Sequence, residues 1–163
     1  MTTELEQNQK YETPMVGLRE AYISYWKNAF CWRGRSTRAE LWWPGLVNGV
    51  LFIIMFLLMN QNSLLLFIFM GIFQIITFFP GLAVFVRRAH DIGKSAWFAL
   101  SITYGTSILG QLFGKLAEKI HDSTFYIFTG ILMIFLGLLA VFWSFIIAFK
   151  PGQKSPNKYG DPR

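Results

Sequence analysis

The sequence has few of the residues that build disulfides, metal centres or charged surfaces. Its single cysteine, Cys31, excludes an internal disulfide, and two histidines, His90 and His121, are too few for the usual site of nitrogen and sulfur ligands. Only 15% of the residues are Asp, Glu, Lys or Arg, whereas a typical soluble domain has about 25%. We therefore expect no metal ion and no cofactor.

Residues 41–86 contain no Asp, Glu, Lys, Arg or His. An uncharged, apolar stretch of this length is more than a soluble core needs, and it indicates a membrane. The sequence predicts an all-α membrane protein with four transmembrane helices and an N-terminal amphipathic interfacial helix. The transmembrane domain is predicted over residues 32–149, with spans at 41–59, 64–86, 96–113 and 125–149.

The third predicted span differs from the others because polar side chains dilute it. Ser101 and Ser107 favour a helix that packs against other helices rather than against lipid. We expect its hydroxyl-bearing face to turn inward, with a close helix crossing at Gly105, Gly110 or Gly114.

The two ends of the chain differ from its apolar middle. The polar residues 1–12 predict a disordered N-terminus. An amphipathic helix is predicted over residues 13–31, because Thr13 suits the N-cap and Pro14 suits the first helical position. This helix either lies in the membrane interface or packs on the protein's own cytoplasmic surface, and the sequence leaves both open. Residues 150–163 are predicted to form a basic cytoplasmic tail.

The distribution of Lys and Arg predicts the orientation. With four spans, thirteen of the fifteen Lys and Arg residues fall on the side that holds both termini and the link 87–95. The other side has only Lys115 and Lys119. The positive-inside rule therefore predicts that both termini are cytoplasmic. The formal net charge of +6 then favours contact with the phospholipid bilayer, and with anionic lipids in particular, rather than with nucleic acid.

Two charged segments share the predicted cytoplasmic face: "WRGRSTRAELWW" at residues 32–43 and "RRAHDIGKSAW" at residues 87–97. One interpretation is structural, because a carboxylate at a membrane boundary is costly unless it is paired. Glu40 and Asp91 would then form a charge clasp with nearby arginines. The other interpretation is an anion or headgroup site. Its predicted residues are Arg33, Arg35, Arg38, Arg87, Arg88, Lys94 and Ser95.

The same segments do not contain a complete catalytic motif. "DIGKS" is similar to the end of a phosphate-binding loop, but the preceding glycine and strand are missing, which excludes nucleotide hydrolysis. His90 and Asp91 are adjacent, and neighbours on a helix point about 100° apart, so they do not form a working dyad. The predicted spans hold no ionisable residue, which argues against an ion-coupled pump. No catalytic residue is predicted.

Three motifs carry a family resemblance: "GRSTRAELWW", "RRAHDIGKSAW" and "PNKYG". In this order, separated by apolar spans, they resemble the bacterial inner-membrane family of domain of unknown function 805. The resemblance covers nearly the whole chain beyond about residue 20. It implies a small, multi-pass protein of four spans in the bacterial inner membrane, and it implies no activity.

The sequence favours a non-enzymatic envelope protein whose basic cytoplasmic face binds anionic lipid headgroups or a partner protein. A second copy of the chain is an equally open partner. The alternative is a membrane enzyme or carrier that acts on a phosphorylated lipid or another anionic substrate. In that case Arg87, Arg88 and Lys94 would hold the phosphate and His90 would transfer a proton.

Overall fold

The computed structural model describes residues 16–58, 64–120 and 123–162. Within these ranges the regular structure is helical, apart from one isolated bridge between Asn157 and Gly160. Three of the described helices are long and apolar enough to cross a membrane: Arg38–Leu58, Leu64–Asp91 and Thr124–Phe149.

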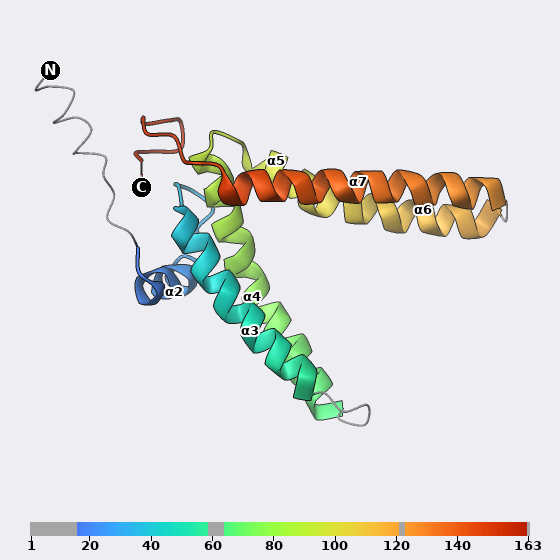
Figure 1. Ribbon diagram of the computed structural model, residues 1–163, viewed down its shortest axis with the longest axis horizontal. Coiled ribbons are helices and arrows are strands. Elements are labelled where there is room, and N and C mark those ends of the chain that lie inside the picture. The colour runs from blue at the N-terminus through green and yellow to red at the C-terminus, as the bar shows by residue number, and fades with distance from the viewer. Residues whose placement is uncertain (1–15, 59–63, 121–122, 163) are drawn as a thin grey trace, which may run out of the picture.

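The helices form two hairpins that diverge from a common end (Figure 1). That end also holds the N-terminal helix, the loop before α3, the link after α4 and the C-terminal tail. We refer to it as the polar end. The first hairpin consists of α3 (Arg38–Leu58) and α4 (Leu64–Asp91), preceded by α2 (Leu18–Lys27). The second consists of α5 (Ala96–Leu100), η1 (Ser101–Gly105), α6 (Thr106–Ile120) and α7 (Ser123–Phe149).

The N-terminal helix α2 packs on the first hairpin. It begins after Gly17, and the predicted start at Thr13 and Pro14 lies outside the described residues. Ala21 and Tyr25 are buried, whereas Trp26 is 38% exposed. Packing on the protein is one of the two arrangements that the sequence allows. Contact of the exposed face with the membrane interface stays a prediction.

Tyr25 joins α2 to the region of α4 that contains Pro80. Its hydroxyl donates a hydrogen bond of 2.8 Å to the carbonyl oxygen of Thr77, three residues before the proline. Burial, and to a lesser degree the neighbouring Tyr22, raises the pKa of Tyr25 to about 12. The hydroxyl therefore stays protonated and able to donate at physiological pH.

We expect Tyr25→Phe to lower the free energy of unfolding by about 1 kcal/mol, because it removes one buried hydrogen bond and little packing. Denaturant titration of the purified protein in detergent would measure the change. Tyr126→Phe, at an exposed position of α7, is the control and should leave stability unchanged. Equal stability of the two variants would contradict a structural role for the Tyr25 hydroxyl.

Helix α4 extends further than the second predicted span and includes the residues Arg87 to Asp91. It ends in a left-handed turn at Gly93, where φ is 79°. The amides of Gly93 and Lys94 donate to the carbonyl oxygens of His90 and Ala89, at 3.0 and 2.8 Å, and so satisfy carbonyls at the helix end. The first half of the predicted link is therefore helical, which fixes the directions of its side chains.

The third predicted span consists of α5, the π-helical turn η1 and α6. Gly110 faces α7, because an added Cβ atom would lie 2.6 Å from Cε at the flexible end of the Met133 side chain. A close crossing of the two helices at a glycine stays a prediction. Among the hydroxyl-bearing residues expected to face inward, Ser101 and Ser107 are exposed and Thr106 is half-buried, whereas the side chain of Thr103 lies outside the described part of the structure. The expectation is therefore wrong for the two serines.

Candidate functional site

Asp91 lies at the centre of a buried ionic cluster at the polar end. Its Oδ1 atom accepts a hydrogen bond of 2.8 Å from Nε of Arg35, and Oδ2 accepts one from Arg88. The carboxylate is 2% exposed, and both arginines are buried as well. Burial of a carboxylate is costly unless it is paired, and here two guanidinium groups replace its hydration.

Arg88 also connects α4 to the end of α7. Its Nε atom donates to the carbonyl oxygen of Ile147 at 3.1 Å, and its Nη2 atom donates to that of Lys150. A longer contact of 3.5 Å reaches the carbonyl oxygen of Ser36. One guanidinium group therefore holds the first hairpin, the second hairpin and the loop before α3 together.

Arg87 connects α4 to the chain between α2 and α3. It donates to Oγ of Ser36 at 3.0 Å, to the carbonyl oxygen of Asn28 at 2.8 Å and to that of Cys31. Ser36 is fully buried, and its amide donates in return to the carbonyl oxygen of Arg87 at 3.2 Å. Arg87 thus has protein acceptors, as Arg35 and Arg88 do.

Glu40 lies at the start of α3, where it caps the helix. Its backbone amide donates to Oγ1 of Thr37 at 3.2 Å, and its Oε2 atom accepts from the amide of Thr37 at 3.0 Å. Oε1 accepts from the hydroxyl of Ser24 on α2 at 2.9 Å. This reciprocal pair is a capping box, and the "TRAE" spacing before an apolar run predicts it. Pairing of Glu40 with an arginine stays a prediction.

His90 is 5% exposed and lies between the loop before α3 and the tail. Its Nδ1 atom is 3.1 Å from the carbonyl oxygen of Gly34, so this nitrogen carries the proton. The ring stacks on Tyr159 with 3.8 Å between centroids and an interplanar angle of 7°. This packing gives His90 a structural position, and the proton-transfer role of the alternative hypothesis stays a prediction. Among the described residues, no cluster of three or more His, Cys, Asp and Glu side chains could hold a metal ion.

The remaining predicted residues of the anion site lie near the surface. Arg33 and Arg38 are exposed, and Lys94 is half-buried. Ser95 is the N-cap of α5, where its hydroxyl accepts from the amide of Phe98 at 3.2 Å. The two charged segments therefore meet, but they divide into a buried set of arginines and an exposed set of cations.

The tail covers the ionic cluster, which the sequence analysis did not predict. The amide of Gln153 donates to the carbonyl oxygen of Asp91 at 2.9 Å, and the side chain of Asn157 donates to that of His90 at 3.0 Å. Arg35 in turn donates to the carbonyl oxygens of Gln153 and Ser155. The "PNKYG" motif marks the segment, but backbone acceptors have no sequence signature.

Gly152 is a second contact of the tail that the sequence analysis missed. A Cβ atom added at this position would overlap the carboxylate of Asp91. Glycine is therefore required because the backbone passes directly against the buried ion pairs.

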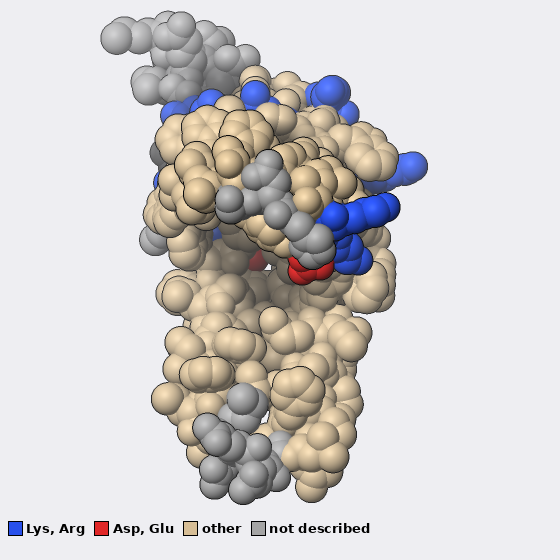
Figure 2. Space-filling view, turned by 90° about the vertical axis from the view of Figure 1, so that its right-hand side faces the viewer, with Lys and Arg blue, Asp and Glu red and all other residues tan. Residues whose placement is uncertain are grey.

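Figure 2 looks onto the free end of the second hairpin, where Lys or Arg side chains lie beside an acidic one, and further Lys and Arg residues lie above and behind it. The length of the first hairpin below shows almost only uncharged residues. The exposed cations of the polar end on the loop before α3, at the first residue of α3 and on the tail are Arg33, Arg38, Lys150, Lys154 and Lys158.

Comparison with known proteins gives a family and relatives, but no activity. The family described as "Protein of unknown function (DUF805)" matches residues 29–161. The chain is similar to inner membrane protein YhaH of Escherichia coli, from strain K12 and from O157:H7. Each is 37% identical over 83 residues, which are 48% of this chain and 69% of the relative. No solved structure matches the chain.

Proposed function

Because the chain belongs to the family of proteins of unknown function DUF805, and its relatives YhaH are inner membrane proteins, we propose that it acts in the bacterial inner membrane. It is a non-enzymatic, multi-pass protein of four spans, with both termini in the cytoplasm. Its α2 helix lies at the cytoplasmic interface, and the exposed cations of the polar end bind anionic lipid headgroups.

The division of the cations supports this proposal most strongly. Arg35, Arg87 and Arg88 are buried on protein acceptors, so they hold the helices together. Arg35 and Arg88 pair with the carboxylate of Asp91. In the described part of the chain no ion pair within 4 Å is formed by the exposed Arg33 or Arg38, and a bilayer of anionic lipid supplies the missing charge.

The fourth span in this proposal is the continuous run of α5, η1 and α6. Its last two turns carry Lys115, Glu118 and Lys119, and these charges support a position of this helix end beyond the opposite membrane surface. The asymmetry of Lys and Arg along the chain supports the same orientation.

Cysteine labelling tests this topology. We expect an impermeant maleimide to leave native Cys31 unlabelled on intact cells, because it is exposed on the cytoplasmic side. In a Cys31→Ser background, Lys154→Cys should also stay unlabelled and Glu118→Cys should react. All three positions should react after the membrane is permeabilised. Labelling at position 154 but not at 118 in intact cells would reverse the orientation.

Native mass spectrometry of the full chain in detergent tests the binding. We expect wild-type protein to retain phosphatidylglycerol in preference to phosphatidylcholine with the same acyl chains. A cation near an anionic membrane contributes about 1 kcal/mol, or roughly a factor of five. The double variant Arg33→Gln/Arg38→Gln should therefore lose part of the preference.

The matched control is Lys115→Gln/Lys119→Gln, which removes two exposed charges from the far end of α6. It should keep the wild-type preference. Equal retention of the two lipids by wild-type protein would contradict the proposal. The same spectra report the number of subunits, and therefore any second copy of the chain.

A further inference from the structure

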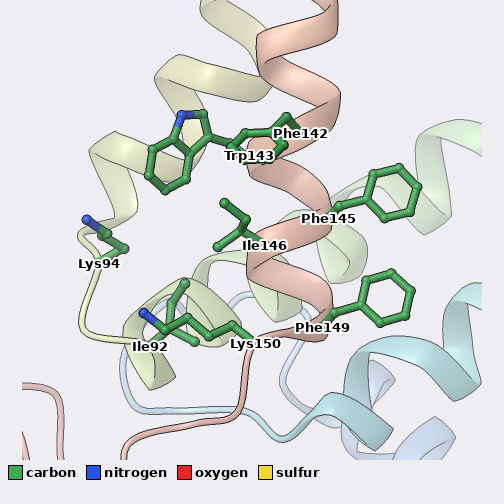
Figure 3. Close-up of a pocket in the computed structure, with 8 residues that line it drawn as sticks. All are labelled: Ile92, Lys94, Phe142, Trp143, Phe145, Ile146, Phe149 and Lys150. Atoms are coloured by element: carbon green, nitrogen blue, oxygen red, sulfur yellow. The ribbon is translucent and has the colours of Figure 1, made fainter.

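A groove beside the last two turns of α7 combines an apolar wall with two lysines. It has a volume of about 640 Å³, within the range of sites for small ligands. Figure 3 shows Trp143 and Ile146 on the same side of α7 as Lys94 and Lys150, with Ile92 beside Lys150. Phe142, Phe145 and Phe149 complete the lining.

The two lysines mark the polar end of this groove. Lys94 follows the left-handed turn at Gly93, and its ammonium group lies 4.9 Å from the ring centroid of Phe98 and 5.5 Å from that of Trp143. These rings hold the charge in place without neutralising it. Lys150 follows the last residue of α7 and is exposed. Neither lysine has a carboxylate within 4 Å in the described part of the chain.

We propose that this groove binds one anionic phospholipid, with its phosphate between Lys94 and Lys150 and an acyl chain along Trp143 and Ile146. The proposal rests on the proposed function and names the ligand that this part of the polar end binds. Charge complementarity selects the lipid, because two ammonium groups attract a phosphate and zwitterionic headgroups offer no net charge.

The shape of the site favours a lipid over a free phosphate ion. From Trp143 to Phe149 the helix rises about 9 Å, at 1.5 Å per residue, which is enough to follow the upper part of an acyl chain. The lining residues other than the two lysines are apolar, so a free phosphate would leave most of the groove uncovered.

Native mass spectrometry with phosphatidylglycerol tests the site. We expect wild-type protein to show one tightly retained lipid per chain, and Lys94→Gln/Lys150→Gln to reduce its retention about 10- to 30-fold, because each cation is worth roughly a factor of five. Lys94→Arg/Lys150→Arg keeps both charges and should retain the lipid. Lys115→Gln/Lys119→Gln should match wild type. Inorganic phosphate added in excess should not displace the lipid.

The outcomes separate this site from the general lipid preference. If wild-type protein prefers phosphatidylglycerol and Lys94→Gln/Lys150→Gln retains as much as wild type, the groove is overturned while the proposed function stands. If inorganic phosphate displaces the bound phosphatidylglycerol, the ligand of the groove is not a lipid. If Lys94→Gln/Lys150→Gln is not monodisperse in detergent, the test is made with Lys94→Arg/Lys150→Arg. A folded Arg variant that does not retain the lipid would overturn the site.

Discussion

Asp91→Asn is expected to destabilise the protein by about 3–5 kcal/mol, which is the usual cost of removing one partner from a buried ion pair. The amide has nearly the same size as the carboxylate, so packing changes little. The loss comes from Arg35 and Arg88, which would keep their charges in a buried position without the carboxylate that lies between them.

The measurement is the free energy of unfolding in detergent, by denaturant titration with circular dichroism as the signal. Asp161→Asn is the matched control, because this carboxylate lies on the exposed surface of the tail. The control should stay within about 0.5 kcal/mol of wild type. If Asp91→Asn does the same, the ionic cluster does not stabilise the fold.

Gly152→Ala is expected to destabilise the protein by about 1–3 kcal/mol, as is typical of overpacking. The added methyl group would overlap the carboxylate of Asp91, which cannot move away without breaking its bonds to two arginines. We expect the tail to detach from the cluster. Hydrogen exchange of the Gln153 amide, which donates to the carbonyl oxygen of Asp91, would become faster.

Gly137→Ala is the matched control for this prediction. Gly137 lies within α7, and a Cβ atom at that position would meet no atom within 4 Å. Because alanine favours a helix interior over glycine by roughly 0.5–1 kcal/mol, this variant should be as stable as wild type or more stable. The two substitutions should thus act in opposite directions, and destabilisation of equal size would contradict the contact between tail and cluster.

The membrane class could be predicted from the sequence because it depends on composition. The absence of charge over residues 41–86 is enough to indicate long apolar helices, and the structure contains α3 and α4 there. The exact ends depend on local signals. Thr37 and Glu40 start α3 through a capping box, and Gly93 ends the last turn of α4. Both signals can be read from the sequence once the helix that they bound is known.

The division of the charged residues could not be predicted in the same way. Arg35 and Arg38 are three residues apart and chemically identical, yet one is 3% exposed and the other lies on the surface. The difference arises from the tail, whose backbone carbonyl oxygens accept from Arg35. These acceptors lie more than a hundred residues away along the chain. Because every residue has a backbone carbonyl group, the amino-acid sequence does not mark which ones accept.

The pairing of Arg35 with Asp91 joins the loop before α3 to the end of α4. A charge swap measures it most directly, through the free energies of unfolding of Arg35→Asp, Asp91→Arg and the double variant. We predict that each single variant is strongly destabilised, and that the double variant is more stable than the sum of the two losses by about 0.5–3 kcal/mol. Losses that simply add in the double variant would contradict the claim.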